Sequence, residues 1–225
     1  MNTTHVKFTR YARDASLAFM LSIILMDLSY VVLFRASPPQ QWEGVAKYSQ
    51  TFRVSSMLPV FAGLAVVPTY MFLCRYWGSL TNGVGRAWTR IGIAFSYLFA
   101  IISGSAYLVQ LLVVLPRAQS GRLEGLEALI FANDRSLAWA ANYWGWFFLG
   151  ISAFCFAQSL TWSGVDRVIK LLLWIYAASS ILLVLGYMLQ NLPLQLPMVI
   201  CWFTVQPLAY SLLGVRFDRL LRPRI

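Results

Sequence analysis

The sequence predicts an all-α, polytopic integral membrane protein, a helix bundle of six transmembrane helices with both termini cytoplasmic. Composition, six long apolar segments and an uneven distribution of Lys and Arg lead to this prediction. Of 225 residues, 59% are hydrophobic and 12% are charged, whereas soluble domains average about 45–50% apolar and about 25% charged residues. We expect a single transmembrane domain over residues 1–225.

Six apolar segments are each long enough to cross a bilayer, which takes about 20 residues of helix. We expect helices at about residues 15–35, 53–75, 89–115, 136–160, 167–189 and 192–215. The second segment contains Pro59 and Pro68, and the sixth contains Pro197 and Pro207. Helices embedded in lipid tolerate proline when neighbours satisfy the freed carbonyls, so we expect kinks in these two.

The Lys and Arg residues predict the orientation. Twelve of the 18 fall on the side that holds both termini: Lys7, Arg10, Arg13, Arg75, Arg86, Arg90, Arg167, Lys170, Arg216, Arg219, Arg222 and Arg224. The other side holds Arg35, Lys47, Arg53, Arg117, Arg122 and Arg135. Cytoplasmic loops are enriched in basic residues, so the termini are expected in the cytoplasm. This asymmetry explains the net charge of +10 without nucleic acid, and we expect no nucleic-acid partner.

Two long connections, 36–52 and 116–135, fall on the outer side. In the second, Leu123, Leu126 and Ile130 have helical spacing, which predicts a short helix lying in the membrane interface. The first has a less regular set of similar spacing: Trp42, Val45 and Phe52. Together the two connections are expected to roof a cavity that opens outward.

The residue types argue against several kinds of chemistry. His5 is the one histidine and precedes the first apolar segment, which argues against bis-histidine haem, an HExxH zinc site or a histidine-rich iron centre. No DDxxD-like pair occurs for a magnesium-bound diphosphate. Three cysteines, Cys74, Cys155 and Cys201, lie in or beside apolar segments and are interpreted as small buried hydrophobes. We therefore expect no metal and no cofactor.

Asp27 lies near the middle of the first segment, in "LSIILMDLSYVVLF", residues 21–34. A charged carboxylate near the bilayer centre costs ~2.5–3.5 kcal/mol on insertion scales, so such residues usually face the bundle interior and are functional candidates. No Lys or Arg is expected at matching depth, and burial disfavours the anion, so we expect a protonated acid. Two interpretations stay open: a catalytic acid, or a structural acid bonded to Asn142 or a serine.

Other polar and aromatic residues are expected at similar depth. The candidate ligand-binding residues are Tyr107, Asn142, Tyr143, Trp146, Tyr176 and Trp202. Deep aromatic side chains can line a cavity for a flat or branched lipid, and core packing is the alternative for each. A ladder of small residues with spacing four should let helices approach closely: Gly92, Ser96, Ala100 and Gly104.

Two stretches, "FRVSSMLPVFAGLAVVPTYMFLCR" (52–75) and "YWGWFFLGISAFCFAQSL" (143–160), carry a resemblance to a known group. In these stretches and in helical layout, the chain resembles small six-helix bacterial membrane proteins grouped as a domain of unknown function. The resemblance implies a location in the bacterial inner membrane. It transfers no functional residues.

Three functions remain open on the sequence. The first is binding of a lipophilic molecule, an isoprenoid or another lipid, that Asp27 protonates, as in metal-independent terpenoid cyclisation or isomerisation; a neutral acid can protonate an alkene, and aromatic faces stabilise the cation. The second is a non-enzymatic membrane subunit, assembly factor or transport component with a membrane protein partner. The third is a proton-coupled transporter, because a single intramembrane acid resembles part of a proton relay. It ranks last because neither an internal repeat nor a second titratable partner is visible.

Overall fold

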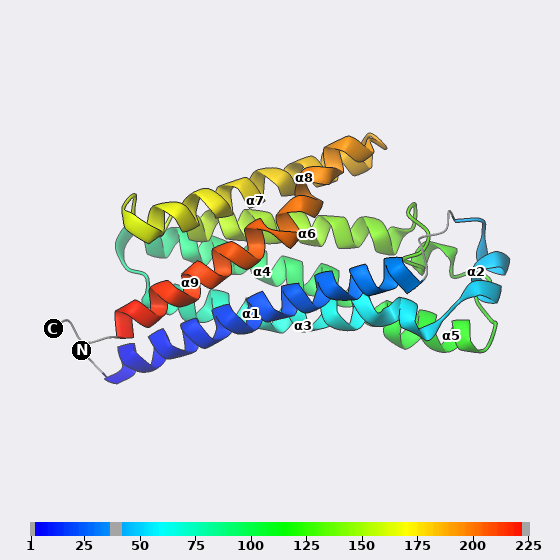
Figure 1. Ribbon diagram of the computed structural model, residues 1–225, viewed down its shortest axis with the longest axis horizontal. Helices are drawn as coiled ribbons and strands as arrows, with labels where there is room; N and C mark the ends of the chain where they lie inside the picture. The colour runs from blue at the N-terminus through cyan, green and yellow to red at the C-terminus, as the bar shows by residue number, and fades with distance from the viewer. Residues whose placement is uncertain (1–2, 37–41, 222–225) are drawn as a thin grey trace.

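The computed structural model describes residues 3–36 and 42–221, and this part of the chain contains helices and no strand. The helices follow in the order α1 Thr3–Ala36, α2 Val45–Thr51, α3 Leu58–Leu80, α4 Gly83–Val109, α5 Leu115–Gln119, α6 Leu137–Ala157, α7 Gly164–Met188, α8 Leu192–Phe203 and α9 Val205–Leu221 (Figure 1). A π-helical turn, Gln110–Val114, joins α4 to α5. Short 3-10 turns occupy Val54–Met57 and Glu127–Leu129.

Five stretches of the described chain are long and apolar enough to cross a membrane: Thr4–Arg35, Val54–Leu80, Gly83–Gln119, Gly164–Met188 and Leu192–Leu221. The protein is therefore membrane-embedded. Helix α6 has 21 residues and no charged side chain, and at 1.5 Å per residue it is about 30 Å long. Helix α6 is not one of the five stretches.

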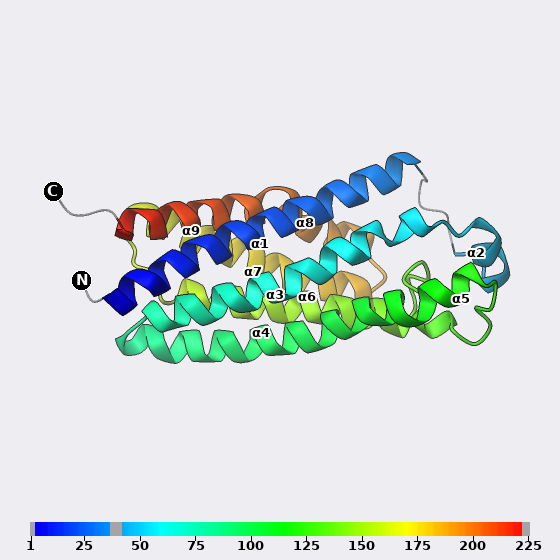
Figure 2. The same ribbon diagram turned by 90° about the horizontal axis from the view of Figure 1, so that it is seen from below.

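The long helices run side by side along one axis (Figures 1 and 2). Helix α1 packs between α3 and α9, α4 packs against α3 and α6, and α7 contacts α6, α8 and α9. The start of α1 and the end of α9 lie at the same end of the bundle, which we call the terminal end. The opposite, outer end carries α2, α5 and the connection that precedes α6.

Several helices extend further at the terminal end than the apolar segments predicted. Helix α1 begins at Thr3, not near residue 15, and α3 continues to Leu80. Lys and Arg have high helix propensity, so the charged turns that hold Lys7, Arg10 and Arg75 continue each helix past its apolar part. Arg222 and Arg224, which the sequence predicts on the side of the termini, lie outside the described residues.

The last predicted helix is broken in two. At Thr204 the backbone has φ −129° and ψ −64°, which ends α8 before α9 begins. Pro207 explains the break, because it lacks an N–H for the carbonyl of Phe203 and its ring clashes with the preceding turn. The other prolines leave their helices continuous: Pro59 lies in the first turn of α3, and Pro68 and Pro197 lie within α3 and α8.

The small-residue ladder of α4 serves two neighbours, not one. A Cβ added to Gly92 would lie 2.8 Å from the ring of Phe156 in α6, whereas Gly104 faces Val67 of α3. Twelve residues at 100° each turn the helix by about 120° more than three full turns, which separates the two glycines onto different faces. The ladder therefore lets α6 and α3 approach α4 at different depths.

The predicted interfacial helix in the second connection is wrong. Leu123 and Ile130 are fully buried, but between α5 and α6 only the turn Glu127–Leu129 is helical. Gly125 has φ +77°, a left-handed conformation that interrupts an α-helix and that glycine adopts readily. In the first connection, helix α2 (Val45–Thr51) contains Val45, whereas Trp42 and Phe52, the other two residues of that pattern, lie outside it.

Hydrogen bonds between side chains tie the helices together inside the bundle. The Tyr70 hydroxyl of α3 donates to Ser152 Oγ at 2.9 Å, and Ser152 donates to the Gly92 carbonyl at 2.7 Å. Phe19 of α1 lies 4.6 Å from the ring of Tyr210 in an edge-on contact. These contacts join α3 to α6 and α4, and α1 to α9.

A buried ion pair fastens α7 to α9 at the terminal end. Arg216 Nε donates to Asp166 Oδ1 at 2.5 Å and Nη2 donates to Oδ2 at 3.2 Å. Asp166 also accepts from the backbone N–H and hydroxyl of Thr161. The Asp166 side chain is 12% exposed, so little solvent screens the pair.

We expect Asp166→Ala to lower the free energy of unfolding by roughly 3 kcal/mol, because it leaves the Arg216 guanidinium without its partner in a poorly solvated site. Thermal unfolding of the detergent-solubilised protein measures this loss. Arg219→Ala, which removes an exposed cation one turn further along α9, is the matched control. Equal midpoints for the two variants would contradict the role of the ion pair.

Candidate functional site

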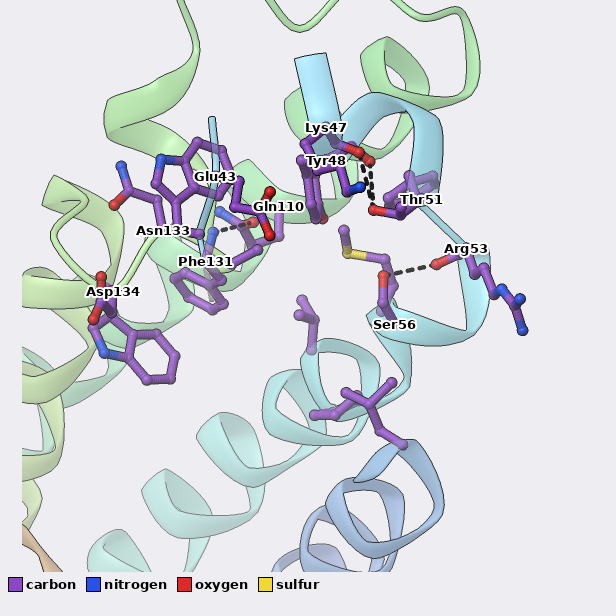
Figure 3. A pocket seen from close by; sticks show the side chains of 18 of the residues that line it. Glu43, Lys47, Tyr48, Thr51, Arg53, Ser56, Gln110, Phe131, Asn133 and Asp134 are labelled. Atoms are coloured by element: carbon purple, nitrogen blue, oxygen red, sulfur yellow. Dashed lines mark hydrogen bonds between the residues drawn. The ribbon is translucent and has the colours of Figure 1, made fainter. Parts of the chain in front are cut away.

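A cavity of about 1120 Å³ lies at the outer end of the bundle (Figure 3). Its walls come from the end of α1, the residues around α2, the start of α3, the π-helical turn, the connection before α6 and the start of α6. The two outer connections thus border an open cavity, as the sequence predicted. We call this the outer cavity.

Aromatic side chains make up seven of the 23 residues that line the outer cavity. They are Tyr30, Phe34, Trp42, Tyr48, Phe52, Phe131 and Trp139. Tyr48 stacks in tilted and edge-on contacts between Trp42 and Phe52, each at 5.7 Å, and Phe131 meets Trp139 at 5.5 Å. Burial raises the pKa of Tyr48, so its hydroxyl is neutral at physiological pH. The aromatic part of the wall is apolar with neutral hydrogen-bonding tips, and ten of the 23 lining residues have polar or charged side chains.

Charged side chains of both signs lie along the same cavity. They are Glu43, Lys47, Arg53, Asp134 and Arg135, and all five are exposed. No ion pair joins any of them to another described residue. Their charges are therefore available to a polar group that enters from outside. An aromatic wall with a mixed-charge border suits a molecule that is apolar along most of its length and polar at one end.

Gln110 fixes the connection that forms one side of the outer cavity. Its Nε2 donates to the Leu129 carbonyl, and its Oε1 accepts from the Phe131 N–H at 3.1 Å. Gln110 is fully buried and is the first residue of the π-helical turn, a feature often found at functional sites. One side chain thus satisfies two partly buried backbone groups and positions Phe131 in the wall.

The structure brings four of the candidate ligand-binding residues together below the outer cavity. The Trp146 and Trp202 rings are 5.2 Å apart, Tyr107 lies beside Trp146, and Tyr176 lies beside Trp202. All but the half-buried Trp202 are at most 3% exposed. They form an aromatic layer that joins α4, α6, α7 and α8.

The other two ligand-binding candidates, Tyr143 and Asn142, are not part of this aromatic layer. Tyr143 packs against Trp139 at 5.2 Å and Tyr187 at 4.9 Å, and its hydroxyl donates to Gln195 Oε1 at 3.0 Å. Asn142 is 4% exposed, and its Oδ1 has no hydrogen-bond partner among the described residues. Tyr143 therefore links α6 to α8 at the outer end.

Asp27 is buried, with 5% of its surface exposed, and it is not one of the residues that line the outer cavity. Tyr30, one turn further along α1, does line it and lies close enough to Asp27 to interact electrostatically. The expected hydrogen bond from Asp27 to Asn142 or a serine is not found: Asp27 Oδ1 has no partner among the described residues. Of the serines at this level, Ser179 and Ser180 bond to carbonyls of their own helix, whereas Ser103 Oγ has no hydrogen-bond partner among the described residues.

No three His, Cys, Asp or Glu side chains of residues 3–36 and 42–221 gather where they could hold a metal ion. The three cysteines are free and buried.

Comparison of the chain with known protein families, with curated proteins and with solved structures finds no match.

Sequence reasoning missed two buried glutamines, Gln110 and Gln206. Both lie in otherwise apolar runs, "YLVQLLV" and "FTVQPLA", and both are at most 1% exposed. An amide in a membrane span needs hydrogen-bond partners just as a carboxyl group does, so their position in these runs was the available signal.

We expect Gln110→Leu to loosen the connection that borders the outer cavity, because the partly buried Leu129 carbonyl and Phe131 N–H would lose their partner, at a cost of up to about 1–3 kcal/mol each. Hydrogen–deuterium exchange over residues 123–136 should become faster. Gln158→Leu, at the other end of α6, should leave it unchanged, since that side chain bonds only within its own helix. Unchanged exchange in the Gln110 variant would refute this role.

Proposed function

We propose that this protein is a multi-pass protein of the bacterial inner membrane that binds a lipophilic molecule with a polar end group in the outer cavity. The volume and lining of this cavity support the proposal most directly. Its aromatic wall suits an isoprenoid or another lipid chain, and the charges of Lys47, Glu43 and Arg135 suit the polar end. About 1120 Å³ slightly exceeds the usual range for small-molecule sites, about 300–1,000 Å³.

The proposed topology has six spans, with α6 as the fourth and α8 plus α9 as the sixth. Two features support it. The start of α1 and the end of α9 lie at the same end of the bundle, and the length of α6 matches the thickness of the hydrocarbon core, about 30 Å. The excess of Lys and Arg at that end supports a cytoplasmic location for both termini.

Cysteine labelling of intact cells tests this topology. Ser120→Cys at the outer end and Ser163→Cys at the terminal end are both exposed positions, and the native cysteines are buried. A membrane-impermeant maleimide should label the first variant in intact cells and the second only after lysis. Labelling of Ser163→Cys in intact cells would reverse the orientation.

In addition to ligand binding, we propose that Asp27 is an acid that protonates the bound molecule. It lies one turn below Tyr30, which lines the outer cavity, so a chain that extends inward past Tyr30 would meet the carboxyl group. The aromatic layer of Trp146, Trp202 and Tyr107 would then face a developing cation, which aromatic rings stabilise. This arrangement supports acid-initiated cyclisation or isomerisation of an isoprenoid.

A lateral groove supports the alternative, a subunit that packs against another membrane protein. It has a volume of about 390 Å³ between α6 and α7 and is lined by Ile151, Phe154, Trp174, Ala177, Ala178 and Ile181. Small residues such as Ala177 let a further helix approach closely. A stable complex through this face, with an empty outer cavity, would favour this alternative.

Native mass spectrometry of protein extracted gently from its own membrane tests ligand binding. We expect a discrete lipophilic adduct, with occupancy reduced about tenfold or more in Trp42→Ala, because burying a large apolar side chain contributes about 1.5–3 kcal/mol and 1.4 kcal/mol is tenfold in affinity. Trp162→Ala, at the terminal end, is the control. An adduct unaffected by Trp42→Ala would exclude the outer cavity as its site.

The same measurement on Asp27→Asn tests the acid role. The adduct should remain bound, and its chemical structure should be that of an unreacted precursor, because the amide cannot donate a proton to an alkene. If the wild type and Asp27→Asn carry the same molecule, Asp27 is not the acid.

A further inference from the structure

Four side chains near the break between α8 and α9 hold polar atoms without hydrogen-bond partners among the described residues. They are Asp27 Oδ1, the Tyr176 hydroxyl, Trp202 Nε1 and both amide atoms of Gln206. Asp27, Tyr176 and Gln206 are at most 5% exposed. Nearly all buried polar atoms in proteins are paired, so this group requires an explanation other than packing.

Helix register brings Asp27 to the depth of the break. On α1, Ser16 donates to the Tyr210 carbonyl of α9 at 2.7 Å, and Met20 contacts Ser211. Asp27 follows Ser16 by eleven residues, about three full turns, so it projects from the same face of α1. Counting the same number of residues outward along the antiparallel partner leads from Tyr210 to Val199, and counting seven residues from the Met20–Ser211 contact leads to Thr204. Asp27 therefore lies at the depth of the last turn of α8 and the break, and α1 does contact α8.

The other three groups reach this depth from α7, α8 and α9. Tyr176 lies beside Trp202 and close to Tyr210. Gln206 lies one turn from Tyr210 on the buried face of α9, between Tyr210 and the break. The unpaired atoms of Tyr176, Trp202 and Gln206 are therefore grouped at the interruption of a membrane span, where irregular backbone is tolerated only if protein or water surrounds it.

The chemistry of the unpaired atoms favours water over a metal ion. The indole N–H of Trp202 and the amide N–H₂ of Gln206 donate only, and they repel a cation. The Gln206 Oε1 and Asp27 oxygens accept, and the Tyr176 hydroxyl does both. Such a mixture of donors and acceptors matches water, which makes about three hydrogen bonds in a buried site.

We propose that Asp27 is a proton-binding group that exchanges its proton with the outer cavity through the Tyr30 hydroxyl and water held by Tyr176, Trp202 and Gln206. In uptake, a proton from water in the outer cavity passes to the Tyr30 oxygen as the Tyr30 hydroxyl gives its own proton inward. The Asp27 carboxylate becomes the neutral acid, and Tyr30 is unchanged. Release runs in reverse.

The surroundings of Asp27 suit this role because no fixed charge among the described residues lies at its depth. Along α1, Arg13 and Arg35 are about 21 and 12 Å away at 1.5 Å per residue. The buried titratable side chains of the surrounding helices include Tyr70 of α3, Tyr107 of α4, Tyr143 of α6, Tyr176 of α7, Cys201 of α8 and Tyr210 of α9, and Tyr and Cys side chains are neutral at physiological pH at their ordinary pKa values. A proton on Asp27 therefore changes the net charge of the site from −1 to zero, and such intramembrane acids form proton relays.

Infrared difference spectroscopy of the ligand-free full chain tests the proposal independently of any lipophilic ligand. The protein is reconstituted in one orientation in vesicles of phosphatidylethanolamine and phosphatidylglycerol. A carbonyl stretch of a protonated carboxyl group should appear, be absent in Asp27→Asn and return at a shifted frequency in Asp27→Glu. Its intensity should follow the pH of the medium that bathes the outer cavity, between about pH 5 and pH 9.

Tyr30→Phe supplies the second measurement, because it keeps the ring and removes the hydroxyl. The response of the Asp27 band to a pH jump on the outer side should slow at least tenfold. Tyr97→Phe, on the exposed face of α4, should respond like the wild type. A band that follows only the pH on the terminal side, that never changes over this range, or that responds equally fast in Tyr30→Phe would overturn the proposal.

Discussion

Water is absent from the hydrocarbon core of a membrane, so each backbone N–H and C=O there must find a partner within the protein. The rest of this structure depends on that constraint. It forces the chain into long helices, and it draws side-chain hydroxyls to their own helix: Ser22 donates to the Ala18 carbonyl and Ser96 to the Ile93 carbonyl. Two interruptions lie inside the described spans and not at their ends, the π-helical turn at Gln110 and the break at Thr204.

The two interruptions handle this constraint in opposite ways, and each contains a buried glutamine. Gln110 satisfies two backbone groups of a neighbouring connection, so the π-helical turn and the cavity wall hold each other in place. Gln206 leaves both amide atoms unpaired within the described chain. The first interruption is a rigid joint, whereas the second offers unused hydrogen-bonding capacity in the middle of a span.

Much of the fold is predictable because the apolar segments and the bilayer have matching lengths. Helix α7 starts and ends within three residues of its predicted bounds, and the outer cavity lies where the two connections predicted it.

The contacts within the site are less predictable. The Tyr30 position one turn from Asp27 follows from helical spacing, but the meeting of Trp146 with Trp202 depends on how α6 and α8 are rotated. The rotation of α6 and α8 is set by packing that a single sequence does not reveal. The predicted interfacial helix was wrong because apolar spacing took no account of the left-handed Gly125.

The pairing of α1 with α9 has a consequence for biogenesis. Ser16 and Tyr210 are 194 residues apart in the chain, and at about 5–20 residues per second the ribosome needs roughly 10–40 s to make the chain between them. During that time α1 has α3 on one side and no helix on the side of Ser16 and Asp27. The insertion machinery or lipid must cover an acid-bearing face until the last helix arrives. The first helix to be inserted is thus one of the last to complete its contacts, and a chain that stalls before α9 exposes Asp27 to membrane quality control.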